Sequence, residues 1–254
     1  MMSSKQFNAV TSLFDPIGLD EMDKVQLMNR VDTKFAFTQD QLLEFLPILA
    51  KDYKILKVGE NRISRYESLY YDDNLVNYDH HHRGLVNRYK IRYRSYIDSK
   101  ITFLEVKHKY KGRTDKRRIP VHEIPWELSD EHYDFIKTVN PNSNRLKPSL
   151  MNRFSRITLV SKKFDERLTI DIDLSFEWKG EKKLVEHIII AELKQSRQDR
   201  TSPFFKLMKD NFIRPIKISK YCVGIINMYG KDNVKYNRFK KKLIQINKLQ
   251  ANAS

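Results

Sequence analysis

The chain has 254 residues, and its 48 lysines and arginines against 32 aspartates and glutamates give a formal net charge of +16. An excess of this size indicates a polyanionic partner, such as a nucleotide, a phosphate polymer, a nucleic acid or an anionic membrane. Hydrophobic residues make up 40% of the chain, which excludes a disordered basic tail and suffices for one domain with a substantial core.

A single cysteine, Cys222, excludes an intrachain disulfide and a cysteine-based metal site, and it suits a reducing cytosol. The longest wholly apolar run, residues 188–191, is too short to cross a bilayer. Residues 1–10 lack the apolar segment of a signal peptide. We therefore expect a cytoplasmic protein, whose basic surface is able to rest on a membrane.

Hydrophobic periodicity and turn residues predict the elements of the first third of the chain. We expect a short helix over residues 19–28, a strand over 30–37, a helix that begins after Thr38 as its N-cap, and strands over 53–58 and 64–72. Residues 77–84, which include His80, His81 and His82, are expected to form an irregular, solvated loop without a metal.

Antiparallel hairpins dominate the middle of the chain, with strands over 86–96, 101–111 and 114–122 and turns at Asp98-Ser99 and Gly112. A helix over 127–139, strands over 151–161, 166–176 and 185–195, and helices after Ser202 and over 219–229 and 233–249 follow. No repeat or low-complexity linker interrupts them, so we expect one domain over 1–254. About eight strands predict a mainly antiparallel α+β fold whose sheet tends to close around one slender ligand.

Charged and apolar residues alternate within most of these strands, and alternate residues of a strand share a face. The sets that share a face are Arg88, Lys90, Arg92 and Arg94; Arg30, Asp32 and Lys34; Glu105, Lys107 and Lys109; Lys116 and Arg118; Arg167, Thr169, Asp171 and Asp173; and Glu192 and Lys194. For one strand alone, a solvated outer face is the simpler explanation. However, Glu192 lies in a strand that is apolar on both faces, and a buried carboxylate needs a cation or a metal. The complete set predicts a cationic interior.

These segments also carry a resemblance. In chain order they are Arg30-Val-Asp-Thr-Lys-Phe35, Tyr70-Tyr-Asp72, Lys90-Ile-Arg-Tyr-Arg94, Phe103-Leu-Glu-Val-Lys107, Thr114-Asp-Lys-Arg-Arg118, Met151-Asn-Arg153, Arg167-Leu-Thr-Ile-Asp-Ile-Asp173, Ala191-Glu-Leu-Lys194 and Ile216-Lys-Ile-Ser-Lys220. Over about residues 28–230, the set resembles the VTC (vacuolar transporter chaperone) polyphosphate polymerase domain of the triphosphate tunnel metalloenzymes. The resemblance implies an eight-stranded antiparallel β-barrel with flanking helices and a cationic tunnel.

The same resemblance implies an activity and a site. Members of the polymerase branch transfer the γ-phosphoryl group of ATP to inorganic polyphosphate, with Mn²⁺ or Mg²⁺ as the metal. The residues implied to grip phosphate are Lys34, Arg92, Arg94, Lys107, Lys116, Arg153, Arg167, Lys217 and Lys220, of which Arg92, Arg94 and Lys107 would hold the nucleotide. Glu192 is implied as the metal ligand, with Glu105, Asp171 and Asp173 as candidates that act through water.

Two parts of the fungal relatives are not expected here: the SPX domain that senses inositol pyrophosphates and the membrane part, so coupling to transport would require a separate membrane partner. Hydrolases of the superfamily often carry Glu-x-Glu-x-Lys in the first strand, whereas this chain has Arg30 in place of the first carboxylate. That difference favours the polymerase, with a triphosphate or polyphosphate hydrolase as the alternative.

Binding without catalysis is the remaining alternative, either to polyphosphate or to nucleic acid. In strand 86–96 Tyr89 and Tyr93 oppose the cations, which is the wrong arrangement for stacking bases, so no specific nucleic acid is expected. Cys222 is expected to be a packed thiol. The basic run 238–243 is either a solvated helix face or a patch that faces anions or a membrane.

Overall fold

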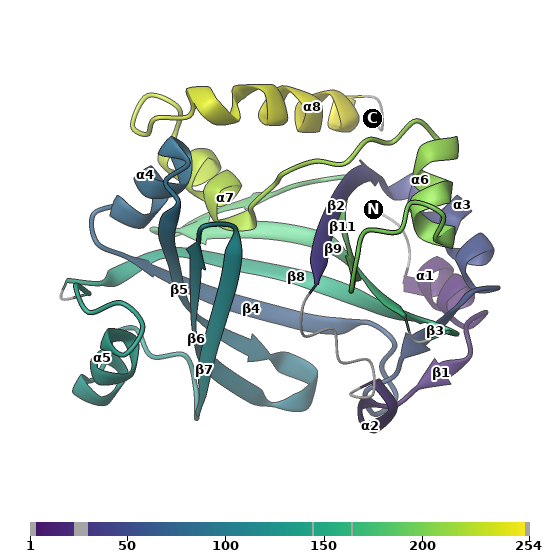
Figure 1. Cartoon of the computed structure of the whole chain (residues 1–254), viewed down its shortest axis with the longest axis horizontal. Coiled ribbons are helices and arrows are strands. Elements are labelled where there is room, and N and C mark those ends of the chain that lie inside the picture. The colour runs from purple at the N-terminus through teal and green to yellow at the C-terminus, as the bar shows by residue number, and fades with distance from the viewer. Residues whose placement is uncertain (1–3, 23–29, 144, 164, 252–254) are drawn as a thin grey trace.

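A single sheet organises the chain in the computed structural model, which describes residues 4–22, 30–143, 145–163 and 165–251 (Figure 1). Its main path runs β2-β11-β9-β8-β4-β5-β6-β7, and every pair on that path is antiparallel. The strands on the path are β2 (Val31–Thr38), β4 (Ser64–Asp72), β5 (Asn87–Tyr96), β6 (Ile101–Tyr110), β7 (Arg113–Val121), β8 (Lys147–Ser161), β9 (Glu166–Trp178) and β11 (Ile188–Gln195). Three short strands join it at the side: β1 (Pro16–Ile17), β3 (Tyr53–Leu56) and β10 (Glu181–Leu184).

The expected eight-strand antiparallel path is present, but the expected closed barrel is not. Among the described residues, β2 and β7 end the path without pairing to each other. The irregular segment 213–219 lies along the free side of β2 instead, where the amide of Ile216 donates to the carbonyl oxygen of Lys34 (2.8 Å). The same segment reaches β5, because the Lys90 ammonium donates to Ser219 Oγ (3.0 Å). A non-strand segment therefore bridges β2 and β5.

The two faces of the sheet carry different residues. We call the face that bears Lys34, Glu192, Asp171 and Arg92 the inner face, and the opposite one the outer face. One half of the outer face packs its aliphatic and aromatic residues against α3 (Gln39–Leu49) and α6 (Pro203–Asp210), with Phe7 of α1 (Ser4–Thr11) in the same cluster. The other half, over β4–β7, packs against Ile136 of α5 (Asp130–Lys137). The outer face is therefore the main hydrophobic support of the strands.

Helix α7 (Lys220–Tyr229) covers part of the inner face, and α8 (Lys240–Ala251) lies over it (Figure 1). A Cβ added at Gly224 would come within 2.4 Å of a Leu150 methyl carbon and 2.6 Å of the Phe176 ring, so only glycine permits this close approach. Because α7 begins at Ser219, whose side chain accepts from the amide of Cys222, Lys220 lies at the end of the helix that faces the charged residues. Cys222 is buried, as expected of a packed thiol.

Most predicted elements are confirmed, including the N-cap Thr38, which forms a capping box with Gln41. Three predictions need correction. Residues 76–83 form a helix, α4 (Val76–Arg83), in which His82 is buried, so the prediction of a solvated loop was wrong. The strand predicted over 185–195 begins later, at Ile188, as β11, because residues 185–187 form a turn in which His187 has a positive φ of 58°. Helix α2 (Leu19–Met22) is described, whereas the rest of the predicted helix lies outside the described residues.

The third correction concerns Asp173, which was expected to share a face with Asp171. Asp173 has a φ of +53° and lies in a β-bulge, where the register against β8 shifts between Arg153 and Ser155. A bulge inserts one extra residue and so changes which positions point inward beyond it. Leu174 consequently joins the inner-face core, and Asp173 is exposed.

Candidate functional site

The register between strands brings the charged residues together on the inner face. Directly opposite residues in an antiparallel pair point to the same side of the sheet. The pairs Lys34–Glu192, Asp171–Arg156 and Arg92–Glu105 therefore fix this face over most of the path. Its other charged members are Asp32, Arg88, Lys90, Arg94, Lys107, Lys109, Lys116, Arg118, Arg167 and Lys194. Cations thus greatly outnumber carboxylates on one continuous surface.

The sheet also curls, so that cations of β6 lie near β2 although the two strands are not paired. Burial first, and then the charge of Lys34, lowers the pKa of Lys107 to about 8, while Glu192 and Asp32 act in the opposite direction. Lys34 likewise lowers the pKa of Lys90, which belongs to β5. The contacts agree: the Lys34 ammonium donates to the carbonyl oxygen of Ile218 (3.3 Å) and the Lys90 ammonium to Ser219 Oγ (3.0 Å), so the inner faces of β2 and β5 meet the same segment and the sheet curves around it.

Glu105 is the centre of the first ionic cluster on this face. Arg92 donates to Glu105 Oε2 from Nη2 (2.6 Å) and from Nε (2.8 Å), and Lys116 forms an ion pair with Oε1. Only 1% of the Glu105 side chain is exposed. Burial alone would raise its pKa, but Arg92, Arg94 and Lys116 outweigh burial and hold the pKa well below its usual range. Glu105 is therefore ionised, and it holds two cations in place.

Asp171 has the same function in a second cluster. Arg156 donates to both of its carboxylate oxygens, from Nε at 2.6 Å and from Nη2 at 2.9 Å, and Lys220 pairs with Oδ2. Burial raises the Asp171 pKa, yet Arg156 and Lys220 together outweigh burial and hold the pKa below its usual value. The bidentate fork fixes the plane of the Arg156 guanidinium, which also lies 5.1 Å from the ring centroid of Phe154.

Glu192 lies in a third cluster, between Lys34 (3.5 Å to Oε1) and Lys194, which pairs with Oε2. Despite burial, these two lysines hold the pKa of Glu192 well below its usual value. No group of three or more His, Cys, Asp or Glu side chains able to hold a metal occurs within the described ranges. As a single protein ligand, Glu192 suits a hard divalent cation that takes its other oxygen ligands from phosphate and water, which is how Mg²⁺ usually binds.

Several inner-face cations have no carboxylate partner in the described part of the chain. They include Lys90, Arg94, Lys107 and Arg167, and the Nε atom of Arg167 is buried without a hydrogen-bond partner. Burial, followed by the effect of neighbouring cations, lowers the pKa of Lys90 to about 7. Unpaired cations that lie so close together repel one another. An anion that binds among them offsets both this repulsion and the free-energy cost of burying the positive charges.

The predicted site residues divide into three groups. Lys34, Arg92, Arg94, Lys107, Lys116, Arg167, Lys220 and Glu192 meet on the inner face as described above. Lys217 is exposed in segment 213–219. The pKa of Lys109 is lowered mainly by burial, then by the charge of Arg88, and then by that of Lys217. Arg153 does not join the others, because its guanidinium pairs with Glu67 (2.9 Å) and with Glu177 on the outer face.

Sequence reasoning also missed residues that the structure places among this set. Arg156 lies three positions after Arg153 and therefore on the opposite face of β8, where it pairs with Asp171. Aromatic rings share the inner face as well: Tyr66 and Phe154 stack with centroids 5.1 Å apart and planes 1° apart, and Arg94 lies over Tyr66 at 5.7 Å. Applying the alternation rule to 152–156 would have found Phe154 and Arg156 together.

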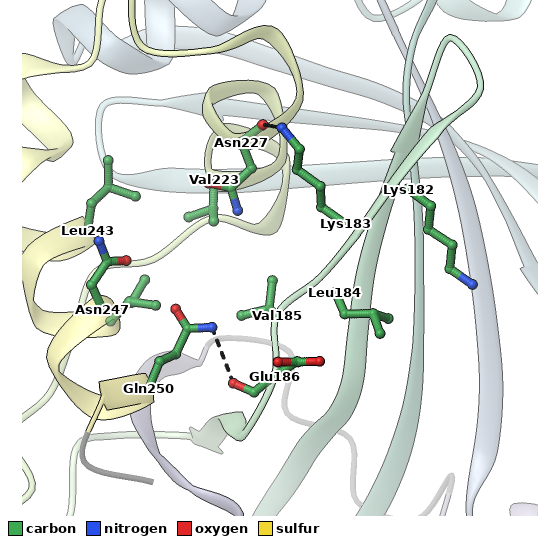
Figure 2. Close-up of a pocket in the computed structure, with 11 residues that line it drawn as sticks. Lys182, Lys183, Leu184, Val185, Glu186, Val223, Asn227, Leu243, Asn247 and Gln250 are labelled. Atoms are coloured by element: carbon green, nitrogen blue, oxygen red, sulfur yellow. Dashed lines mark hydrogen bonds between the residues drawn. The ribbon is translucent and has the colours of Figure 1, made fainter. Parts of the chain in front are cut away.

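A separate hollow of about 420 Å³ lies between β10, α7 and α8 (Figure 2). Apolar side chains such as Val223, Leu243 and Ile246 line much of it, and Gln250 donates across it to the carbonyl oxygen of Glu186 (3.3 Å). Lys183 turns away to donate to the carbonyl oxygen of Asn227 (2.8 Å). Its charged lining residues are Lys182, Lys183 and Glu186 only, far fewer cations than the inner face carries, so we place the candidate site on the inner face.

These features define a class of protein: a curled antiparallel sheet whose inner face is crowded with cations, several of them without a carboxylate partner among the described residues. A model of the VTC domain family matches residues 29–229, and the chain belongs to that family. No curated protein matches the sequence. No helix among the described residues is long and apolar enough to span a membrane.

Several solved structures are similar to this chain at low sequence identity. A Bacillus halodurans protein named "putative adenylate cyclase" is 12% identical with a TM-score of 0.50, over 76% of this chain and 96% of that one. A Vibrio parahaemolyticus protein of the same description is 12% identical with a TM-score of 0.45, over 78% and 99%. The S. pombe RNA triphosphatase Pct1 is 10% identical with a TM-score of 0.30, over 84% and 85%. The Bacillus structure supports the assignment of the fold.

Proposed function

We propose that this protein is a metal-dependent polyphosphate polymerase, which transfers the γ-phosphoryl group of ATP to the end of an inorganic polyphosphate chain. The observation that carries the proposal is the inner face itself. It bears unpaired cations beside three carboxylates, Glu105, Asp171 and Glu192, each of which is neutralised by two cations. A polyanion made of repeated phosphates complements such a surface.

Phosphoryl transfer needs positioning and charge neutralisation more than a protein nucleophile. Arg94 presents a planar guanidinium suited to phosphate oxygens, whereas Lys90 and Lys107 act as point charges. Arg92 and Arg156 add positive charge from guanidinium groups that Glu105 and Asp171 hold in place. The terminal phosphate of the acceptor chain supplies the attacking oxygen, and the β-phosphate of the nucleotide leaves as part of ADP. Glu192 would hold a Mn²⁺ or Mg²⁺ ion, which neutralises charge on the transferred group when bound.

Several of these cations are held in fixed positions, which favours stabilisation of the transition state of phosphoryl transfer. The ion pairs with Glu105 and Asp171 hold Arg92, Lys116, Arg156 and Lys220 in place before substrate arrives. Preorganised charges of this kind do not have to reorganise as negative charge shifts from the nucleotide to the acceptor. Only 19% of the Arg92 side chain and 16% of the Arg156 side chain are exposed, and this partial burial strengthens the electrostatic attraction between their charges and phosphate.

The test is an incubation of purified protein with ATP and Mn²⁺, with products separated by length on a gel and nucleotides quantified. The expected result is ADP together with an acid-labile polymer. Orthophosphate and ADP without polymer would identify a hydrolase, and the absence of any turnover, with ATP still bound, would identify a binding protein. Either of these results would overturn the polymerase proposal.

A further inference from the structure

A row of aromatic rings crosses the inner face at one end of the ionic clusters. Tyr66 stacks on Phe154, Tyr96 lies 4.9 Å from Tyr66, and Phe103 lies 5.9 Å from Tyr96 between ring centroids. The row lies where β5 ends at Tyr96 and β6 begins at Ile101, so it forms the rim of the inner face on that side. Phe103 at the end of the row is only half-buried.

Arg118 of β7 covers the last ring. Its guanidinium carbon lies 4.3 Å from the centroid of Phe103, and the side chain is exposed. Its direct cross-strand neighbour is Glu105, but that carboxylate is already paired with Arg92 and Lys116. Within the described residues Arg118 therefore forms no ion pair, and it presents a flat cation on a flat ring at the rim.

The spacing between this pair and the ionic clusters matches a nucleotide. Phe103 is directly opposite Arg94, and it precedes Glu105 by two residues on the same face, a rise of about 7 Å along a strand. A triphosphate held by Arg92, Arg94 and Lys116 would therefore leave its nucleoside next to Phe103 and Arg118. Bases stack on aromatic rings and on guanidinium planes.

The opposite end of the same strands is different. The inner-face residues there are Arg88 and Lys109, which face each other across β5 and β6. Tyr110, at that end of β6, lies on the outer face by alternation and is 47% exposed. One end of the inner face therefore suits a base, and the other suits bare phosphate.

We propose that Arg118 and Phe103 form a nucleoside subsite, in which the base of a nucleoside triphosphate stacks on the exposed side of the Arg118 guanidinium, which the Phe103 ring supports from below, while its phosphates extend inward toward Arg88 and Lys109. This rests on the proposed function, because it takes the inner face to be the triphosphate site. Stacking accepts any base, so ATP and GTP should bind with similar affinity.

The test compares ATP with tripolyphosphate, which has the phosphates but no base, by titration calorimetry at one fixed salt concentration. Phe103→Leu removes the ring, and Arg118→Lys keeps the charge but removes the flat fork. Each variant should bind ATP about five- to a hundredfold more weakly than the wild type, with tripolyphosphate affinity within about twofold. Tyr110→Leu, which removes an exposed ring from the same strand on the outer face, should change neither affinity.

The outcomes separate the two proposals. Unchanged ATP affinity in both variants, or an equal loss for ATP and tripolyphosphate, overturns the nucleoside subsite and leaves the triphosphate site standing. A wild-type protein that binds neither ligand overturns the proposed function and the subsite with it. Arg118→Lys is informative even where Phe103→Leu lowers the melting temperature, because the exposed Arg118 forms no ion pair in the described chain.

Discussion

Two arginines of one strand provide a matched test of which face binds the substrate. Arg153 and Arg156 both belong to β8, but the first pairs with Glu67 and Glu177 on the outer face and the second pairs with Asp171 on the inner face. Replacing each with glutamine removes one positive charge and leaves a side chain of similar polarity. The net charge of the protein changes equally in both variants.

The expected magnitudes follow from the contacts. A hydrogen bond to a charged group contributes about 1.5–3 kcal/mol, so Arg156→Gln should weaken tripolyphosphate binding by about ten- to a hundredfold. It should also destabilise the fold by up to about 3 kcal/mol, because Asp171 keeps Lys220 but loses its bidentate partner. The Arg153 side chain is 38% exposed, so Arg153→Gln should cost about 1 kcal/mol or less.

Calorimetric titration with tripolyphosphate, together with the melting temperature of each variant, measures both effects. Arg153→Gln should bind within about twofold of the wild type, because a lone outer-face charge is screened by salt. If Arg153→Gln weakened binding more than Arg156→Gln, the substrate would lie on the outer face and the assignment of the inner face would be refuted.

Three further predictions test other parts of the account. Glu192→Gln should reduce activation by Mn²⁺ by at least about tenfold with little change in fold, and unchanged metal dependence in turnover assays would exclude this ligand. Burial lowers the pKa of Lys220 to about 8 and that of Lys90 to about 7, so above these values the unfolded chain binds more protons than the folded protein, and stability without ligand should rise with pH from 7 to 9. Over the same range the affinity for triphosphate should fall, because the anion prefers protonated lysines. Binding at pH 8 should therefore take up protons, which calorimetry in two buffers detects. Gly224→Ala should lower stability by about 1 kcal/mol through contact with Leu150 and Phe176, and a raised melting temperature would contradict the close packing of α7.

Strand alternation made much of this fold predictable. The period-two pattern of residues 86–96 correctly placed Arg92 and Arg94 on one face, and the capping residues correctly placed α3 and α6. Alternation failed at Asp173, where a bulge adds a residue that no local pattern announces. The prediction of a loop over residues 77–84 was wrong for another reason. The polar composition of this stretch was taken to indicate a loop, whereas tertiary contacts such as that of His82 with Asn237 support a helix.

Whether the sheet closes could not be predicted from local sequence pattern, because closure depends on how the two ends of the strand path meet. Segment 213–219 takes the free side of β2 through Ile216 and so occupies the place of a neighbouring strand. The site was predictable to the extent that like-faced cations indicate a shared space. The sequence prediction named Arg153 and not Arg156, because the face of β8 that points inward is set by its register against β9.

The most direct test of the central claim is a crystal structure of the protein with tripolyphosphate bound. We expect density for the anion on the inner face, in contact with Arg92, Arg94 and Lys107. An anion bound only on the exposed basic surface of α8, with the inner face free of phosphate, would contradict it.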